Sequence, residues 1–421
     1  MRLTLVCLLA TLSVGILSAK EDSHYQIPVN DEGLPGAGTI RRYDWFQGLW
    51  EKKRSAWAKE VEAKQGALVF LGDSITQGWG DDIRGAFQTK VANRGISGDT
   101  TRGMLIRMKE DVLSLKPSGV VLLLGTNDLE EGAEPEVIAE NLKLIVAGLK
   151  AFDPEMPIVL CNVFPSSASK KRPAEKIKKI NSLYAAAVKG DRQVTVINTW
   201  AMFADENGDA RKAEFPDLLH PNATGYTMWE NTLRPVLETL NLVEVPKDDF
   251  QPEPGFELLF NGKDLTGWGY RTKKSLEKTR NFDGREMSSE GRYLARHGRL
   301  IVTTPPEGRA FGQLWTDEEF GTDFTLKLEF RANAEADSGV FIRKPQLQCR
   351  DYLVAGPYKE LKNYKAGDWN EIIVEVKGRV AHCTCNGEVL EDEFELPESG
   401  PIGLEGDRGQ MEYRRIRLRK N

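Results

Sequence analysis

Short hydrophobic runs alternate with helical patterns over residues 66–244 of the chain. Each run is nearly free of polar residues, which is typical of parallel strands that are covered on both faces. Parallel neighbours also need long crossover connections, usually helices. The pattern therefore predicts a three-layer α/β domain with a doubly wound parallel sheet. Its expected strands are Ala67–Leu71, Val120–Leu124, Ile158–Val163 and Val194–Ile197.

One helix of this domain is predicted to begin at Pro135, since proline is favoured at the first helical position. Apolar residues after it recur at intervals of three and four, as on the buried face of an amphipathic helix. They are Ile138, Leu142, Ile145, Val146 and Leu149.

A different pattern follows the segment 245–255, whose prolines and charges predict a linker. Apolar and polar residues now alternate, for example over 324–330 and 372–376, as in strands with one buried face. Asn386-Gly387 is a typical sequence for a tight hairpin turn. Residues 256–421 are therefore predicted to form an antiparallel β-sandwich.

The first 19 residues have the pattern of a cleaved signal peptide: a basic Arg2, an apolar run and a small residue at Ala19. The run from Leu3 to Leu17 is shorter than the ~20 residues of a spanning helix, so an uncleaved anchor is the weaker alternative. No later apolar stretch reaches that length. We therefore expect a secreted or periplasmic protein without a membrane span.

Residues 20–65 are assigned to an N-terminal leader segment that precedes the α/β domain. From Asp44 to Glu62 it is rich in tryptophan and continues as a basic, amphipathic stretch, for which we expect a packing role.

Composition excludes some functions. Lys and Arg number 57 against 63 Asp and Glu, so the net charge of −6 implies no broad basic surface for nucleic acid. The five cysteines contain no C-x-x-C pair, and no metal site is expected. Cys383 and Cys385 share one face of a predicted strand, so one of them could bridge to Cys349, or all three could be buried thiols.

Ser74 is predicted to lie at the carboxyl end of the first strand, where open α/β sheets bind their ligands. It lies in a Gly-x-Ser-x-Thr sequence, which differs from the Gly-x-Ser-x-Gly elbow of α/β-hydrolases. Taken alone, a serine here could simply cap the following helix.

Two further segments could supply hydrogen-bond donors. Asn93–Thr100 is predicted to be a loop in which Gly98 presents a backbone N–H, and Asn127 follows the strand Val120–Leu124. Both groups could donate to an oxyanion. The alternatives are a tight turn for Gly98 and an Asx-type loop bond for Asn127.

His220 is the sole histidine between residues 25 and 296. Pro221 disfavours a helical conformation at His220, so Asp217 and His220 are predicted to share a loop. The carboxylate could then hold one ring nitrogen and leave the other free to accept a serine proton.

These four blocks, in this order, resemble the SGNH subgroup of the GDSL esterase family, including its members similar to platelet-activating-factor acetylhydrolase catalytic subunits. The resemblance covers residues ~45–240. It implies Ser74 as nucleophile, His220 as general base and Asp217 as its partner. The N–H groups of Ser74 and Gly98 and the Asn127 amide would form the oxyanion hole. It further implies a serine esterase that hydrolyses short acyl esters, with acetylated carbohydrates as the expected substrates and with no metal or organic cofactor.

The second domain resembles the 3-keto-disaccharide hydrolase family, a lectin-like β-sandwich, over residues 256–421. The matching segments are 256–268, 338–343, 367–370 and 413–416. The resemblance implies a domain that binds or processes glycan. Three readings stay open: an esterase with a glycan-binding domain, a bifunctional enzyme that also cleaves 3-keto-glycosides, and a glycan-binding surface protein with a vestigial esterase. Candidate sugar contacts are Trp268, Trp315, Arg343, Gln348, Asp351 and Glu405.

Overall fold

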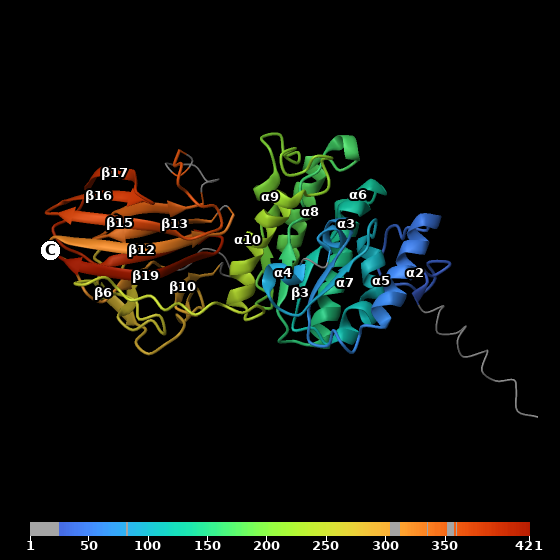
Figure 1. Cartoon of the computed structure of the whole chain (residues 1–421), viewed down its shortest axis with the longest axis horizontal. Coiled ribbons are helices and arrows are strands. Elements are labelled where there is room, and N and C mark those ends of the chain that lie inside the picture. Colours follow the sequence, from blue (N-terminus) through green and yellow to red (C-terminus); the bar gives the residue numbers. More distant parts are fainter. Residues whose placement is uncertain (1–24, 81–82, 304–311, 335, 352–357, 359) are drawn as a thin grey trace, which may run out of the picture.

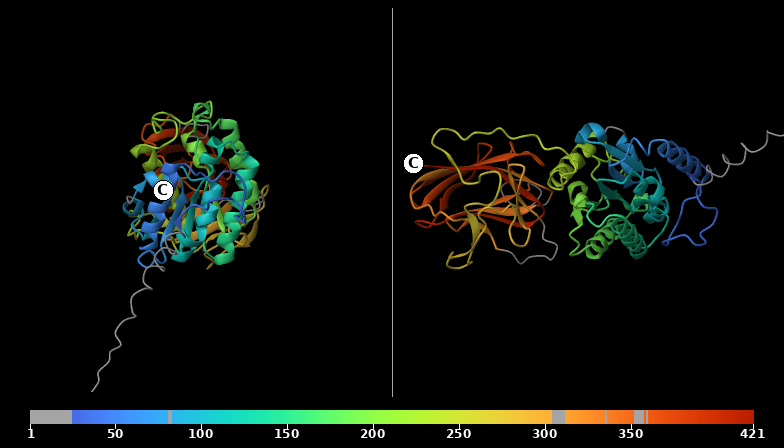
Figure 2. Two further views of the ribbon diagram at one scale, coloured as in Figure 1. Left: turned by 90° about the vertical axis from the view of Figure 1, so that its right-hand side faces the viewer. Right: turned by 90° about the horizontal axis from the view of Figure 1, so that it is seen from below.

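The computed structural model describes residues 25–421 apart from 81–82, 304–311, 335, 352–357 and 359 (Figure 1). The expected signal peptide, 1–19, lies outside the described residues. An α/β unit and a β-sandwich lie side by side along the long axis of the molecule (Figure 2). The segment between them, 245–255, contains no helix or strand.

The α/β unit is built on one sheet of five parallel strands in the order β2-β1-β3-β4-β5. This confirms the predicted doubly wound, flavodoxin-like fold. The direction of winding reverses between β1 and β3, and at such a switch point the loops diverge and leave a crevice for a ligand. The strands are β1 Leu68–Gly72, β2 Val91–Gly95, β3 Gly119–Leu123, β4 Ile158–Cys161 and β5 Val194–Ile197.

Helices cover both faces of this sheet and form two cores. In β1, Val69 and Leu71 belong to one core, and Leu68 and Phe70 to the other. The first core is shared with α5 Thr101–Asp111, α7 Pro135–Phe152 and α8 Ala174–Ala187. The second is shared with α3 Ser74–Gly78, α4 Ile83–Phe87, α9 Thr199–Phe203 and α10 Ala223–Thr239. Short helical segments α6 Thr126–Glu130, η3 Leu113–Leu115 and η4 Ala168–Lys170 lie in the connections.

Helix α7 agrees with its prediction, because it begins at Pro135 and buries all five periodic residues. Two strands differ from expectation. Val194–Ile197 was predicted to be covered on both faces, but β5 is the edge strand of the sheet and is largely accessible. Residues Val91–Gly95 form β2, whereas Asn93–Gly95 had been assigned to a loop, because Asn93 and Arg94 hide the strand pattern.

The leader segment forms helix α2, Asp44–Ala58, which packs against α5. Phe46, Trp50 and Trp57 are buried in a small core with Ile96. Arg54 pairs with the buried Asp111 of α5 at 3.0 Å. These contacts agree with a packing role for this helix.

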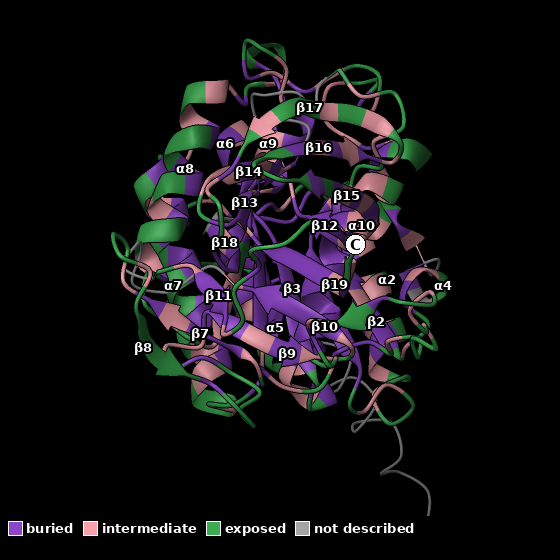
Figure 3. Ribbon diagram, turned by 90° about the vertical axis from the view of Figure 1, so that its left-hand side faces the viewer, coloured by how far each residue is buried: buried purple, intermediate pink, exposed green. Residues whose placement is uncertain are grey.

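The second unit is a sandwich of two antiparallel sheets, as predicted. The buried residues of both sheets form one core that includes Phe324, Leu326, Leu328 and Phe330. Figure 3 shows buried residues gathered in the central strands, while the edge strands β8 and β17 are mostly accessible. One sheet has the order β17-β16-β15-β12-β19-β10-β9 with β6 beside β19, and the other has the order β14-β13-β18-β11-β7-β8.

The strands of the first sheet are β6 Glu257–Leu258, β9 Tyr293–Arg296, β10 Arg299–Val302, β12 Phe324–Ala332, β15 Asn370–Lys377, β16 Val380–Cys385, β17 Glu388–Glu395 and β19 Met411–Lys420. Those of the second are β7 Trp268–Arg271, β8 Lys278–Asn281, β11 Leu314–Thr316, β13 Asp337–Ile342, β14 Gln346–Arg350 and β18 Ile402–Arg408. Asn386 and Gly387 both have positive φ and connect β16 to β17 as a tight hairpin. Cys349, Cys383 and Cys385 are free and buried.

A buried group of charges joins the two units. Glu238 near the end of α10 accepts from Arg299 at 2.6 Å and from Arg331 at 2.7 Å, and Arg331 also contacts Glu412 at 2.6 Å. Gln410 donates to the Pro235 carbonyl of α10 at 3.2 Å. Helix α10 is therefore shared between the units. Within the described residues, no helix has the length and apolar character needed to cross a bilayer.

We expect Glu238→Gln to lower the free energy of unfolding by about 3 kcal/mol or more, because it leaves two buried guanidinium groups with less negative charge. Urea denaturation of the full chain measures the change. The control is Glu140→Gln, since Glu140 forms an exposed pair with Lys143 and its loss should cost less than about 1 kcal/mol. Equal effects of the two variants would contradict a stabilising role for the buried group.

Candidate active site

Ser74 lies two residues after the end of β1, at the switch point between β1 and β3. Asp73, rather than Ser74, caps helix α3, because its carboxylate accepts from the Ile75 N–H at 2.9 Å. Burial raises the pKa of Asp73 to about 6, although this hydrogen bond acts in the opposite direction. A Cβ atom at Gly72 would lie 2.0 Å from the Thr76 hydroxyl, so glycine is needed for the close turn from strand to helix.

His220 and Asp217 meet Ser74 from the loop before α10. The His220 Nε2 atom lies 3.0 Å from the Ser74 Oγ atom, and His220 Nδ1 lies 2.7 Å from Asp217 Oδ2. Since an ionised carboxylate only accepts, the Nδ1 atom carries the proton and Nε2 is left to accept from the serine hydroxyl.

The Asp217 carboxylate is held as an anion. Burial raises its pKa, but the backbone N–H and ring of His220, followed by the Leu219 N–H, outweigh burial and lower the pKa to about 2. Its Oδ1 atom accepts from the His220 N–H at 2.7 Å and from the Leu219 N–H at 3.0 Å. The loop is anchored further by Ser166, whose hydroxyl donates to the Leu218 carbonyl at 2.8 Å.

Gly98 and Asn127 occupy adjacent segments beside Ser74's strand. Gly98 has φ +86° in the loop after β2, and Asn127 lies in the first turn of α6 after β3. The Asn127 Nδ2 atom donates to the Asp99 carbonyl at 3.0 Å, which joins the two segments. The structure thus brings Ser74, His220 and Asp217 into contact and places the two expected donors on neighbouring loops.

Arg172 is a residue of this region that the sequence analysis missed. It is buried, and its guanidinium donates to Asn127 Oδ1 at 2.9 Å and to the Thr126 carbonyl at 3.0 Å. Because arginine has no acceptor, these bonds require Asn127 to present its oxygen to Arg172 and its NH₂ group on the other side. The sequence gives no signal for this role, since Arg172 follows two other basic residues, Lys170 and Lys171, in a polar loop.

Arg107 is the second missed residue. It is fully buried on α5 and donates to the carbonyl of Gly72 at 3.2 Å, to that of Arg94 at 2.8 Å and to Asp99 at 2.7 Å. One guanidinium therefore ties the ends of β1 and β2 to the loop that contains Gly98.

The six candidate sugar contacts of the second unit do not form one site. Trp268 is fully buried and donates to the Leu259 carbonyl at 2.7 Å, and Arg343 is buried and donates to four carbonyls, those of Phe320, Thr322, Gly378 and Pro397. Both are structural, which corrects their assignment: an alternating strand pattern does not tell which bulky residues face the core. Trp315 is also buried, against the Phe341 ring.

Of the other three candidates, Glu405 and Gln348 lie on one face of the second sheet, because both pair with Gly339 from opposite sides. Trp315 lies on the same face, since its partner Gly403 is two residues before Glu405. Asp351 lies apart from these three. Glu405 accepts from Gln313 at 2.8 Å and Gln346 at 3.0 Å on the second sheet. Gln348 lies on the edge strand β14 and accepts from Arg350. Asp351 is buried and lines a different pocket, between the two units.

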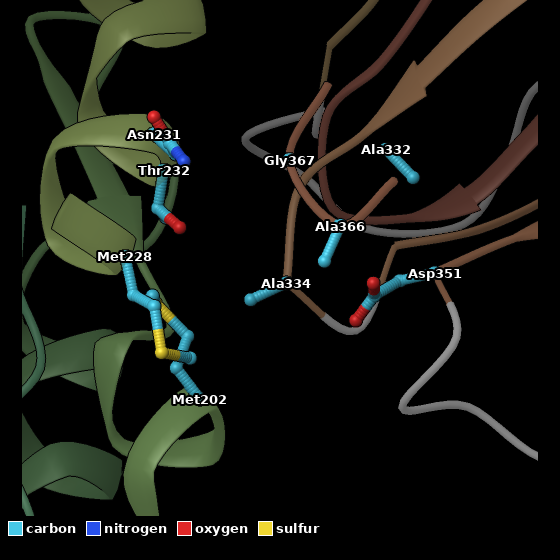
Figure 4. Close-up of a pocket in the computed structure, with 9 residues that line it drawn as sticks. All are labelled: Met202, Met228, Asn231, Thr232, Ala332, Ala334, Asp351, Ala366 and Gly367. Atoms are coloured by element: carbon cyan, nitrogen blue, oxygen red, sulfur yellow. The ribbon is translucent and has the colours of Figure 1, made fainter. Parts of the chain in front are cut away.

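That pocket lies between helices α9 and α10 and the loops of the sandwich (Figure 4). Met202 and Met228 face Ala334 and Asp351 across it. It contains none of the expected esterase residues. Among the described residues, no group of three or more His, Cys, Asp and Glu side chains is arranged to hold a metal ion.

A serine, a histidine and an aspartate in contact at the switch point of a doubly wound sheet is an arrangement suited to serine hydrolysis. Residues 70–228 match the GDSL-like Lipase/Acylhydrolase family, and residues 255–419 match the 3-keto-alpha-glucoside-1,2-lyase-like domain. The chain therefore contains a GDSL-like acylhydrolase domain followed by a domain of the 3-keto-disaccharide hydrolase type.

Similar proteins match the first half of the chain. Platelet-activating factor acetylhydrolase IB subunit alpha2 of Homo sapiens is 27% identical over 203 residues, which cover 47% of this chain and 87% of that protein. Subunit alpha1 of Bos taurus is 27% identical over 184 residues, which cover 43% and 78%. Among solved structures, a GDSL-like lipase from Bacteroides thetaiotaomicron has 27% identity and a TM-score of 0.40, with coverage of 44% of this chain and 97% of the other. A lipase/acylhydrolase from Enterococcus faecalis has 22% identity and a TM-score of 0.35, with coverage of 44% and 100%.

We expect Gly98→Ala to destabilise the fold for two reasons. Its φ of +86° costs an alanine about 1–2 kcal/mol, and the added Cβ would lie 2.6 Å from the Trp45 ring and 2.9 Å from Arg41, at a further cost of about 1–3 kcal/mol. Urea denaturation measures the sum. Gly66→Ala is the matched control, since Gly66 has φ +73° but nothing within 4 Å of the added atom. A loss of unfolding free energy no larger than that of Gly66→Ala would show that the leader segment does not restrict the space at Gly98.

Proposed function

We propose that the first unit is a serine esterase that hydrolyses short acyl esters, with acetyl esters of carbohydrates as the favoured substrates. The observation that carries the proposal is the contact of Ser74 Oγ with His220 Nε2 at 3.0 Å, with Asp217 at 2.7 Å from the other ring nitrogen. The GDSL-like acylhydrolase match supports hydrolysis of an ester.

In this proposal His220 removes the Ser74 proton while the serine oxygen attacks the ester carbonyl. The tetrahedral oxyanion accepts from the N–H groups of Ser74 and Gly98 and from the Asn127 amide, each worth on the order of 2.7–4 kcal/mol in comparable sites. His220 then protonates the departing alcohol. Water, deprotonated by the same ring, attacks the acyl-enzyme and releases the acid and the serine.

Asp217 remains ionised throughout the cycle, since its pKa lies near 2. It therefore stabilises the imidazolium that forms when His220 holds the serine proton. No step in this sequence requires a redox partner.

The substrate class is supported by the comparisons. Acetyl esters are suggested by relatives that are named as acetylhydrolase subunits, and carbohydrate by the adjoining 3-keto-disaccharide hydrolase-type domain. We propose that this second domain binds or processes glycan. Export is part of the proposal and rests on the signal-peptide pattern of residues 1–19.

Ser74→Ala should lower kcat by at least about 1,000-fold with p-nitrophenyl acetate, because the nucleophile is lost, while thermal unfolding stays close to that of the parent chain. A fluorophosphonate probe should label the parent chain at Ser74 by mass spectrometry and leave the variant unlabelled. Ser182→Ala, at an exposed position of α8, is the control and should keep full activity. Retained turnover in Ser74→Ala would place the nucleophile elsewhere.

Arg172→Met should lower kcat by about 10- to 100-fold with little change in KM, because the Asn127 amide is no longer held with its NH₂ group toward the oxyanion. Steady-state kinetics on the folded variant separate this effect from simple destabilisation. Lys170→Met is the control, and Arg172→Lys should recover part of kcat. A variant that folds and retains the parent kcat would exclude the positioning role.

A further inference from the structure

Two aromatic side chains of the leader segment lie exposed on the surface. Trp45 retains 55% of its accessible area and Tyr43 retains 52%, whereas Phe46, Trp50 and Trp57 of the same segment are buried. The rings of Tyr43 and Trp45 are nearly parallel, with an interplanar angle of 13° and centroids 6.4 Å apart. The packing role that explains the buried aromatic residues of α2 does not explain this pair.

The pair lies beside the proposed oxyanion hole. The nearest atom to a Cβ built on Gly98 is the edge of the Trp45 ring, at 2.6 Å. Gly98 is one of the proposed donors to the reacting carbonyl. A group bound on the exposed part of Trp45 would therefore lie close to the bond that is cleaved.

The pair also contacts the segment of the second donor. The Tyr43 hydroxyl lies 3.3 Å from a carboxylate oxygen of Glu131, which directly follows α6, the helix that contains Asn127. Arg41 donates to the same carboxylate at 2.7 Å and is itself buried. The position of Glu131 is therefore held by the leader segment, and its carboxylate stands at the edge of the aromatic pair.

This combination suits a sugar ring better than an alkyl chain. A pyranose has C–H faces that pack on aromatic rings and hydroxyl groups at its rim that donate to carboxylates. The Glu131 carboxylate already accepts from Arg41 and Tyr43, and its remaining lone pairs can accept from a sugar hydroxyl. An alkyl chain would gain from the rings but would leave those lone pairs unused.

We infer that Tyr43 and Trp45 form a sugar-binding shelf, with Glu131 at its edge, that holds the pyranose ring of the ester's alcohol part. This inference rests on the proposed function, since it deepens the assignment of the substrate. The shelf binds the ring through Trp45 and Tyr43, and Glu131 accepts from a sugar hydroxyl. The leader segment is thus a part of the substrate site as well as a packing element.

The test compares two esters of different alcohols on the full chain. Trp45→Ala should raise KM at least about 10-fold more for an acetylated methyl xylopyranoside than for ethyl acetate, because ethanol is too small to reach the shelf. Trp45→Phe should recover part of the sugar affinity. Phe152→Ala, at an exposed aromatic residue at the end of α7, is the matched control and should leave both esters unaffected.

A binding experiment without turnover gives the second readout. Ser74→Ala should bind the acetylated xyloside in calorimetry, and the double variant with Trp45→Ala should bind it at least about 10-fold more weakly. If Trp45→Ala changes neither the affinity nor the KM for the xyloside, the sugar-binding shelf is overturned. Hydrolysis of ethyl acetate by the parent chain would still support the proposed esterase. A raised KM for p-nitrophenyl octanoate but not for the xyloside would assign the rings to an acyl chain and overturn the sugar inference. Failure of the parent chain to hydrolyse either ester would overturn the proposed function and the shelf together.

Discussion

The buried guanidinium of Arg107 is the constraint on which the candidate site depends. A charge without solvent is costly unless it is paired and its hydrogen bonds are satisfied. Arg107 meets this demand by pairing with Asp99 and by donating to the carbonyls of Gly72 and Arg94. Gly72 lies in the turn before Ser74, Arg94 lies in the neighbouring strand β2, and Asp99 lies in the loop that contains Gly98. Satisfying one charge therefore sets the relative positions of three chain segments that converge on the serine.

Arg172 performs a similar task on the other side of the switch point. Its bonds to Thr126 and Asn127 hold the first turn of α6, and the bond from Asn127 to the Asp99 carbonyl connects that turn to the segment held by Arg107. Two buried cations thus support the two loops. Such prior organisation matters in a hydrolase, because donors that need not rearrange stabilise an oxyanion best.

Helix α10 links the candidate site to the second unit. It begins three residues after His220, and near its other end Glu238 enters the charged group formed with Arg299 and Arg331. The histidine loop and the sandwich are therefore attached to the same rigid element. Elsewhere in the candidate site, Trp45 and Arg41 of the leader segment leave no room for a Cβ atom at Gly98. The leader segment and the sandwich both lie outside the doubly wound sheet. Each of them contacts an element that adjoins a residue of the candidate site.

What the sequence determined by itself depends on short-range patterns. Helix α7 and the alternation in β12 follow from periodicity, and the place of Ser74 at a strand end follows from the apolar run before it. The sequence also predicted that Asp217 and His220 share a loop, because Pro221 limits the backbone locally. Strand β2 was missed because Asn93 and Arg94 interrupt its apolar pattern. Only the tertiary structure decided that Arg107 and Arg172 hold the loops, that Trp268 and Arg343 are internal, and that Trp45 is exposed while Phe46 is not. The physical reason is that a side chain's burial and its partners are set by segments far away in the chain, and local periodicity carries no information on which distant carbonyl or carboxylate will meet it.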